Sequence, residues 1–259
     1  MHKKTIIVLI ILLFLTAIIT CGCYGAIRGS GKIVNRTFDY SNFTRVEVSS
    51  AFEVDIVRGS TYSVNVTADD NLFEYVRVNE FDGVLKIDML PGYSYFPSAL
   101  IARVVMPDIY SLNAYAACEV AVSAFDLPHD FHATASGAST IEFAGLNAVD
   151  FTLEASTASR ITGVITGADM DLGASGASRI TLSGQARNIT LNVSGASNVD
   201  LSGVMAEDAT VGLSGASSAV LNITGTLDAG LTGASHLQYL GDPELGNINL
   251  SDFSSVDRG

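Results

Sequence analysis

The sequence predicts an all-β protein built as a parallel β-helix, a solenoid whose coils hold about 19–20 residues each. Two observations carry the prediction. A Ser-Gly-Ala-Ser motif recurs at nearly constant spacing, and apolar residues alternate with polar ones on both sides of it. The composition also indicates an all-β fold, because 24 glycines and a charged fraction of only 16% are typical of strands joined by tight turns. An apolar content of 48% excludes wholesale disorder.

The motif marks regular β-helix repeats over residues 111–240. Its third position is an alanine in every copy: Ala117, Ala138, Ala158, Ala177, Ala196, Ala216 and Ala234. The first and last of these lie 117 residues apart, so six steps give a mean period of 19.5 residues. Such a period is typical of a solenoid, in which each coil buries its apolar face only against its neighbours. Leucine-rich, hexapeptide and calcium-binding nonapeptide repeats are excluded because their own motifs are missing.

Within one coil, the pattern predicts a strand, an SGAS corner, a second short strand and a Ser-Gly turn before the chain returns. Residues 188–193 show the first strand, since Ile189, Leu191 and Val193 alternate with polar residues. Residues 180–182 show the second strand, and Ser183-Gly184 the expected turn. The motif glycine can adopt a positive φ and turn the chain sharply.

The corner serines have two interpretations. They can hydrogen-bond the backbone at the bend or one another up the stack, which makes the motif a structural corner ladder. Alternatively, they form a hydroxyl array that binds ice or a sugar. The fifth motif position varies along the chain, with Glu119, Arg160 and His236 among its residues. That variety argues against a periodic ligand such as ice.

The N-terminus predicts export. Residues 1–20 combine a short basic start with an apolar stretch and are typical of a signal peptide or an N-terminal membrane anchor. Residues 21–28 are expected to form a tether. Cys21 and Cys23 are candidate lipid-attachment residues, because a cysteine after such a stretch is typical of a lipoprotein processing site; incidental cysteines after a plain signal are the alternative. We expect a protein of the cell envelope or cell surface, membrane-anchored or lipid-anchored, otherwise secreted.

Two regions flank the regular repeats. Residues 29–110 predict an N-terminal β region made of wider coils or a cap, and residues 241–259 a C-terminal tail or a last coil. The aromatic stretch 92–97 predicts a loop in which Tyr93 and Tyr95 either pack back onto the rod or contact a ligand. Solenoid ends expose strand edges, so self-association is expected.

Several short stretches occur in a specific order before the SGAS repeats. They are Gly29-Ser30-Gly31, FTRVEV at 43–48, FEVDIVRG at 52–59, ADDNL at 68–72, DGVLKI at 82–87 and MPDI at 106–109. This order resembles the head GIN domain family of putative autotransporter adhesins, which are exported prokaryotic proteins. The resemblance covers roughly residues 29–240. It implies a right-handed parallel β-helix and supplies no catalytic residues; the first repeat departs from the pattern, with Tyr115 and Cys118 in place of serines.

Charge and cysteine content limit the partners. The chain has 14 Lys+Arg against 27 Asp+Glu, a formal net charge of −13. This argues against nucleic acid and against anionic lipid surfaces, so we expect membrane contact only through the N-terminal anchor or lipid. Only Cys118 of three cysteines lies in the body of the chain, which excludes a disulfide framework there and a Cys/His metal site. No cofactor and no metal are expected.

An enzyme is the alternative function, because many parallel β-helices cleave acidic polysaccharides. Outward carboxylates that could serve are Glu142, Asp150, Glu154, Asp169, Asp171 and Asp200. Arg160 and Arg179 share a motif position, so they are expected to stack and could bind a sulfated or uronic sugar; a solvated face is the plainer interpretation.

We predict a non-catalytic protein with an adhesin-like or structural role, whose partner is a surface polysaccharide or an envelope protein. A polysaccharide-binding or lyase-like β-helix enzyme remains the alternative.

Glycosylation is a separate hypothesis. Seven asparagines begin an Asn-x-Ser/Thr sequence, namely Asn35, Asn42, Asn65, Asn188, Asn192, Asn222 and Asn249. Part of this excess arises because strands that alternate with Ser or Thr create the pattern by themselves. The rest predicts acceptor sites for an N-glycan in a host that has the machinery.

Overall fold

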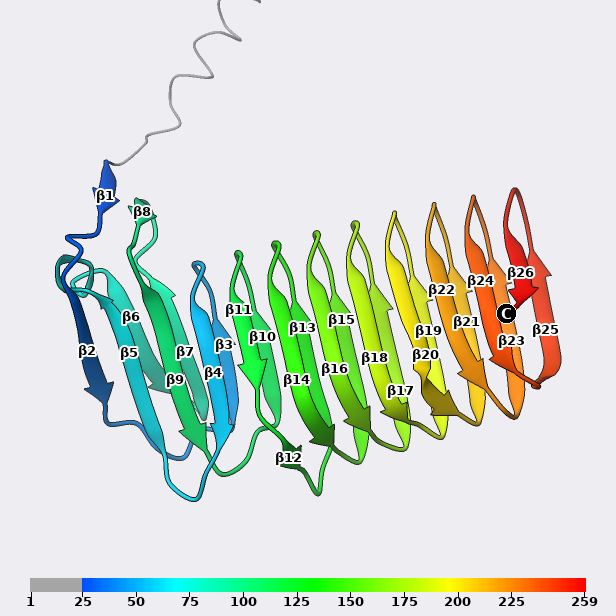
Figure 1. Ribbon diagram of the computed structural model, residues 1–259, viewed down its shortest axis with the longest axis horizontal. Coiled ribbons are helices and arrows are strands. Elements are labelled where there is room, and N and C mark those ends of the chain that lie inside the picture. The colour runs from blue at the N-terminus through cyan, green and yellow to red at the C-terminus, as the bar shows by residue number, and fades with distance from the viewer. Residues whose placement is uncertain (1–24) are drawn as a thin grey trace, which may run out of the picture.

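The computed structural model describes residues 25–259, which form one elongated stack of coils (Figure 1). The predicted parallel β-solenoid is confirmed. Each coil contributes one strand to each of two large sheets, and both sheets run the length of the stack. The predicted signal or anchor (1–20), Cys21 and Cys23 lie outside the described residues. Within residues 25–259, no helix has the length and apolar character needed to cross a bilayer.

The first large sheet, here the pre-corner sheet, holds the strands that enter the corners. In sheet order they are β25 (Glu244–Leu250), β23 (Thr226–Leu231), β21 (Asp208–Leu213), β19 (Asn188–Val193), β17 (Asp169–Ala174), β15 (Asp150–Ala155), β13 (Phe131–Ala135), β10 (Ser111–Ala114), β3 (Arg45–Val48), β7 (Val84–Met89) and β6 (Val76–Phe81). All neighbours are parallel except the β6–β7 pair.

The second large sheet, here the post-corner sheet, holds the strands that leave the corners. In order they are β2 (Ile33–Phe38), β5 (Ser63–Asp69), β9 (Leu100–Met106), β4 (Glu53–Arg58), β11 (Glu119–Val122), β14 (Thr140–Asn147), β16 (Arg160–Thr166), β18 (Arg179–Gln185), β20 (Asn198–Ala206), β22 (Ser218–Ile223), β24 (His236–Gly241) and β26 (Ser255–Arg258). The short β12 (Phe125–Asp126) pairs with β14, and β1 (Ala26–Arg28) pairs with β8 (Ser94–Phe96). One 3₁₀ turn, η1, spans Asp70–Leu72.

The core lies between the two sheets. Alternate residues of each strand point inward and stack on their register partners in the next coil, as Leu172 does on Leu191. The ring of Phe131 on β13 meets Phe143 of the opposite sheet edge-on at 5.7 Å, and Phe151 of the next coil at 6.2 Å. The period-two alternation seen in the sequence therefore reflects burial between two sheets.

Nine corners join the pre-corner strands to the post-corner strands. They lie at residues 49–52, 115–118, 136–139, 156–159, 175–178, 194–197, 214–217, 232–235 and 251–254. Seven of them were predicted from the motif. The first and last were not, because Phe52 and Phe253 stand where the motif has small residues.

Five of the six fourth-position serines make the backbone hydrogen bonds of a corner ladder, the first of the two interpretations, and Ser217 is the exception. All six are buried: Ser139, Ser159, Ser178, Ser197, Ser217 and Ser235. The Ser159 hydroxyl donates to the carbonyl of Ala135 at 2.7 Å, and the Ser178 N–H donates to the Ser197 hydroxyl at 3.2 Å. These bonds satisfy polar groups that would be costly to bury unpaired.

The predicted Ser-Gly turn is wrong. Ser183-Gly184 lies inside β18, and the chain returns one step later, at residues 186–187. Gly184 has a φ of 131°, and a Cβ there would sit 1.9 Å from the carbonyl oxygen of Ile165. The glycine therefore bends the strand against its neighbour without ending it.

The N-terminal end of the stack departs from the regular coil. β5 runs antiparallel to β2 and β9, and β6 antiparallel to β7, so hairpins lie over the first parallel strands. Asp69 at the end of β5 ties this region together. Its carboxylate accepts the N–H groups of Gly31 and Ser98, both at 2.7 Å.

Candidate functional site

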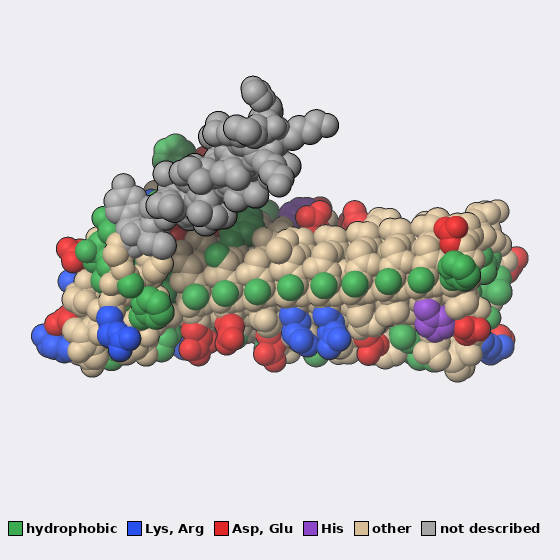
Figure 2. Space-filling model, turned by 90° about the horizontal axis from the view of Figure 1, so that it is seen from above, with side chains coloured by type: hydrophobic (Ala, Val, Ile, Leu, Met, Phe, Trp, Pro, Cys, Tyr) green, Lys and Arg blue, Asp and Glu red, His purple; other side chains and the backbone are tan. Residues whose placement is uncertain are grey.

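The row of corners forms a long edge, here the corner edge, that comprises motif positions one to five. Its crest is the row of third-position alanines, all of which are exposed. Figure 2 looks down on this edge and shows a straight hydrophobic row with charged side chains on one flank. From corner 115–118 to corner 232–235 the crest carries only methyl groups, so an extended ligand can lie along this stretch; the exposed ring of Phe253 stands at the third position of the last corner.

Arg160 and Arg179 stand on the post-corner flank of this edge. They are direct register partners on β16 and β18, so the predicted stacking positions are confirmed. Both side chains are exposed, and within residues 25–259 neither guanidinium makes an ion pair. Figure 2 shows two basic side chains together on this flank, with acidic ones on both sides of the pair. Their role in ligand binding stays a prediction.

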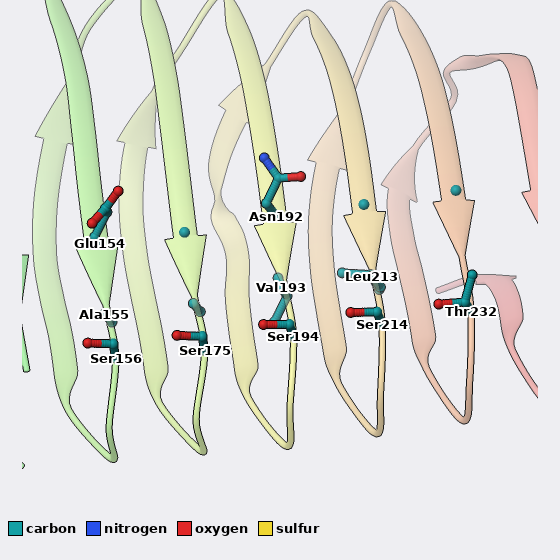
Figure 3. A pocket seen from close by; sticks show the side chains of 14 residues that line it. Glu154, Ala155, Ser156, Ser175, Asn192, Val193, Ser194, Leu213, Ser214 and Thr232 are labelled. Carbon is teal, nitrogen blue, oxygen red and sulfur yellow. The ribbon is translucent and has the colours of Figure 1, made fainter.

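A shallow groove of about 530 Å³ runs along the pre-corner flank. Its wall is a row of hydroxyls at the first motif position: Ser156, Ser175, Ser194, Ser214 and Thr232 (Figure 3). Its floor is open because Gly173, Gly212 and Gly230 stand where other strands place an outward side chain. Glu154 and Asn192 occupy the same register column as these glycines, and their side chains partly divide the groove.

The groove hydroxyls repeat once per coil. Within the described part of the chain, the five hydroxyls have no protein partner, unlike the buried hydroxyls of Ser159 and Ser178. Ladder spacing sets them about 4.8 Å apart. They form a periodic row of donors and acceptors facing solvent.

The structure does not place Tyr93 and Tyr95 at the SGAS corners of the corner edge. They lie around β8, next to the N-terminal strands, with ring centroids 6.1 Å apart. Tyr75 meets the Tyr93 ring at 5.3 Å, and the Tyr95 hydroxyl donates to the carbonyl of Leu90 at 2.6 Å. Burial raises the pKa of Tyr95 above its ordinary value. The segment thus contains strand β8 where a loop was expected, and its tyrosines pack against their own neighbours. Their role in ligand contact stays a prediction.

Three of the six carboxylates proposed for an enzyme share one hollow, and the other three lie elsewhere. Asp150, Asp169 and Asp171 line one hollow of about 320 Å³, whereas Glu154 lies in the groove and Glu142 beside Arg160. Asp200 accepts the hydroxyl of Ser202 at 2.6 Å.

Asp169 is the best-defined of these carboxylates. Asn188 donates to it at 2.8 Å and Arg187 at 3.1 Å, and these two contacts lower its pKa. It is therefore held as a carboxylate, which does not suit a general acid. Within residues 25–259, no group of three or more His, Cys, Asp or Glu is placed to hold a metal ion.

Cys118 is fully buried, and its burial raises the thiol pKa to about 11. It is a small core residue, as its alignment with the corner serines suggested. A thiol with such a pKa is a poor nucleophile.

The seven candidate glycosylation asparagines differ in accessibility. Four are exposed and three half-buried: the exposed ones are Asn35, Asn42, Asn192 and Asn249, and the half-buried ones Asn65, Asn188 and Asn222. The side-chain nitrogens of Asn65 and Asn188 already donate, to Ser63 and Asp169 respectively. Asn192 lies in the groove, where a glycan would fill it (Figure 3).

A family model described as "Putative auto-transporter adhesin, head GIN domain" matches residues 42–243. The chain belongs to this family. The resemblance seen in the ordered motifs is thereby confirmed. No curated protein matches the chain.

Solved structures show the same fold at low identity. A putative lipid binding protein from Parabacteroides distasonis is 17% identical, with a TM-score of 0.86 over 90% of this chain and 99% of that one. A putative adhesin from Parabacteroides merdae is 16% identical, with a TM-score of 0.84 over the same shares. A putative adhesin from P. distasonis is also 16% identical, with a TM-score of 0.77 over 90% of this chain and all of that one. The head GIN family thus supplies the fold and an adhesin-like description.

Sequence reasoning found the arginine pair and missed the groove. The groove depends on glycines at outward strand positions. In the sequence these glycines cannot be distinguished from ordinary turn or strand residues. A register alignment of the repeats would have found it, since Gly173, Gly212 and Gly230 share one column with Glu154 and Asn192.

Proposed function

We propose that the protein is an exported, non-catalytic, adhesin-like component of the cell envelope that binds an extended acidic polysaccharide along the corner edge. The observation that carries this proposal is the unpaired Arg160–Arg179 step on one flank of a smooth crest, with a row of free hydroxyls on the other. Membership of the head GIN family supports the adhesin-like role.

The chemistry fits a polymer better than a small molecule. The edge is long and shallow, and its groups repeat along one direction. Guanidinium groups bind carboxylates and sulfates through paired hydrogen bonds, and hydroxyls match the alternating donors and acceptors of a sugar chain. Each contact is weak, so affinity would come from repetition along the polymer.

Retention chromatography tests the proposal. The purified protein is passed over immobilised polygalacturonate, chondroitin sulfate, dextran and a preparation of host envelope polysaccharide. Saturable retention on an acidic polymer, with none on neutral dextran, is the expected result. Equal passage through every column would contradict polysaccharide binding and favour a protein-binding or structural role.

The same experiment addresses the enzyme alternative. Shortening of the bound polymer, or new unsaturated ends detected by absorbance, would identify a lyase or hydrolase. We expect the polymer to elute with its length unchanged, because Asp169, in the hollow that it shares with Asp150 and Asp171, is held ionised and does not suit a general acid.

A further inference from the structure

The corner backbone changes its hydrogen-bond direction once along the stack. In the N-terminal corners, the third-position N–H donates to the second-position carbonyl of the following coil. These bonds are Ala51 to Ala116, Ala117 to Gly137, Ala138 to Thr157 and Ala158 to Gly176, at 2.8–3.0 Å. In the C-terminal corners it donates to the preceding coil instead. These bonds are Ala216 to Gly195, Ala234 to Gly215 and Phe253 to Gly233, at 2.7–2.9 Å.

The reversal falls between Ala177 and Ala196. The carbonyl of Gly176 points to the preceding coil, because it accepts from Ala158. In a planar trans peptide the N–H points the opposite way, so the N–H of Ala177 faces the following coil. The carbonyl of Gly195 points onward to Ala216, so the N–H of Ala196 faces back. Two N–H groups on adjacent coils therefore face each other.

The backbone dihedrals show the same change. Gly176 and Ala177 both have positive φ, at 63° and 70°, as in the earlier corners. At the next corner Gly195 has a φ of 75°, whereas Ala196 has left the positive region. Within residues 25–259, the N–H groups of Ala177 and Ala196 meet no acceptor, although the third-position N–H is bonded in each of the other seven corners.

An oxygen atom fits between the two donors. Adjacent coils are about 4.8 Å apart. An oxygen about 2.9 Å from both nitrogens would then lie roughly 1.6 Å to the solvent side of the line that joins them. Both alanines are exposed, so an acceptor can approach from outside.

The surroundings favour a negatively charged acceptor. Arg179 follows Ala177 by two residues, so its Cα lies within about 7 Å, and its guanidinium is unpaired within the described chain. The free hydroxyls of Ser175 and Ser194 flank the same two corners on the groove side. We propose that Ala177, Ala196 and Arg179 form an anion notch for a carboxylate or sulfate oxygen. This inference rests on the proposed function and names the group of the polysaccharide that the edge would recognise.

Amide hydrogen exchange tests the geometry of the notch. In the ¹⁵N-labelled protein, the amides of Ala177 and Ala196 should exchange at least tenfold faster than those of Ala158 and Ala216, which are bonded in the same motif position. Equal protection at all four amides would overturn the reversal and the proposal with it.

Sulfate titration tests binding. Sodium sulfate replaces sodium chloride at constant ionic strength while amide resonances are followed. We expect saturable shifts at Ala177 and Ala196 in the millimolar range, with Ala158 and Ala216 unmoved. Absence of shifts, or equal shifts across all exposed amides, would overturn the notch.

Variants separate the notch from general charge effects. Ala196→Pro removes one donor at a residue outside the positive-φ region, and Ala196→Ser keeps it. The proline variant and Arg179→Gln should each weaken sulfate binding about tenfold, while Ala196→Ser binds as the parent does. Unchanged binding in Arg179→Gln would contradict the notch even if the proline variant fails to fold.

The outcomes also separate this inference from the proposed function. Polysaccharide retention without a sulfate response would leave the function standing and overturn the notch. A sulfate response without retention on any polymer would support the notch and overturn the proposed polymer ligand.

Discussion

Arg160 and Arg179 are direct register partners on adjacent parallel strands, and neither has a carboxylate partner within residues 25–259. Two like charges at ladder spacing repel each other, so this arrangement costs stability. The chain has a net charge of −13, yet within residues 25–259 no carboxylate forms an ion pair with either arginine. A ligand that supplies negative charge would relieve the repulsion.

Removal of the arginine pair should abolish polymer binding. We expect the double variant Arg160→Gln/Arg179→Gln to lose at least tenfold in affinity for an acidic polysaccharide, because both guanidinium contacts disappear. The matched control is Arg58→Gln/Arg187→Gln, which makes the same charge change at arginines already paired with Asp126 and Asp169. Equal losses in the two double variants, measured by isothermal titration calorimetry, would show that only net charge matters.

A side chain added at the floor of the groove should stabilise the fold but weaken polymer binding. Gly173 has room for a Cβ, whose nearest neighbour would be Glu154 Cγ at 3.7 Å. Gly173→Thr should raise the free energy of unfolding by about 0.5–1 kcal/mol, because threonine favours a strand, yet reduce polymer affinity. Gly145→Thr, on the post-corner sheet, is the control and should leave affinity unchanged. Undiminished affinity in Gly173→Thr would exclude the groove from the binding surface.

The buried corner serines should differ in their contribution to stability. Ser159→Ala should cost about 0.5–1.5 kcal/mol, because the buried hydroxyl's hydrogen bond to the Ala135 carbonyl is lost, although that carbonyl still accepts the N–H of Ser156. Ser217→Ala should be neutral or slightly stabilising, because the Ser217 hydroxyl has no partner within the described chain. Chemical denaturation of both variants checks the order, and a larger loss in Ser217→Ala would contradict it.

Replacing a glycine that bends a strand with any larger residue should destabilise the fold. Gly184→Ala should cost about 3 kcal/mol or more, because its Cβ would meet the Ile165 carbonyl and its φ of 131° is strained for other residues. Gly230→Ala, where a Cβ meets nothing within 4 Å, should stay within about 0.5 kcal/mol of the parent. Thermal unfolding compares the two, and equal losses would refute the steric argument.

Acid should loosen the N-terminal region through Asp69. Burial alone would raise the pKa of this carboxyl, but the N–H donors of Ser98 and Gly31 outweigh it and hold the pKa below its ordinary value. A lowered pKa stabilises the fold above about pH 4, the unfolded value, and the contribution is lost as the pH falls through the folded pKa. We expect the unfolding temperature to fall below about pH 4, and more gently in Asp69→Asn. Parallel pH profiles for the two proteins would contradict this account.

The solenoid could be predicted from sequence because its cause is periodic. Burial between two sheets forces alternation in every coil, and a sharp corner forces small residues at a fixed spacing. The corners at 49–52 and 251–254 break this pattern, because Phe52 and Phe253 replace small motif residues and Ser50 and Asp252 adopt positive φ in place of the glycine. They can do so because the neighbouring coils hold their backbone in register.

The binding features depend on information that the motif does not carry. Gly176-Ala177 and Gly195-Ala196 sit in identical SGAS sequences, yet their peptide groups point in opposite directions. Each carbonyl faces the neighbouring coil to which its corner is hydrogen-bonded. The groove likewise arises from missing side chains in one register column, which no single repeat reveals.

The most direct test of the central claim is retention on an immobilised acidic polysaccharide, measured side by side for the parent protein and Arg160→Gln/Arg179→Gln. The account predicts saturable retention of the parent, its loss in the variant, and no retention of either on dextran. Identical elution of parent and variant from the acidic column would contradict the assignment of the corner edge as the binding surface.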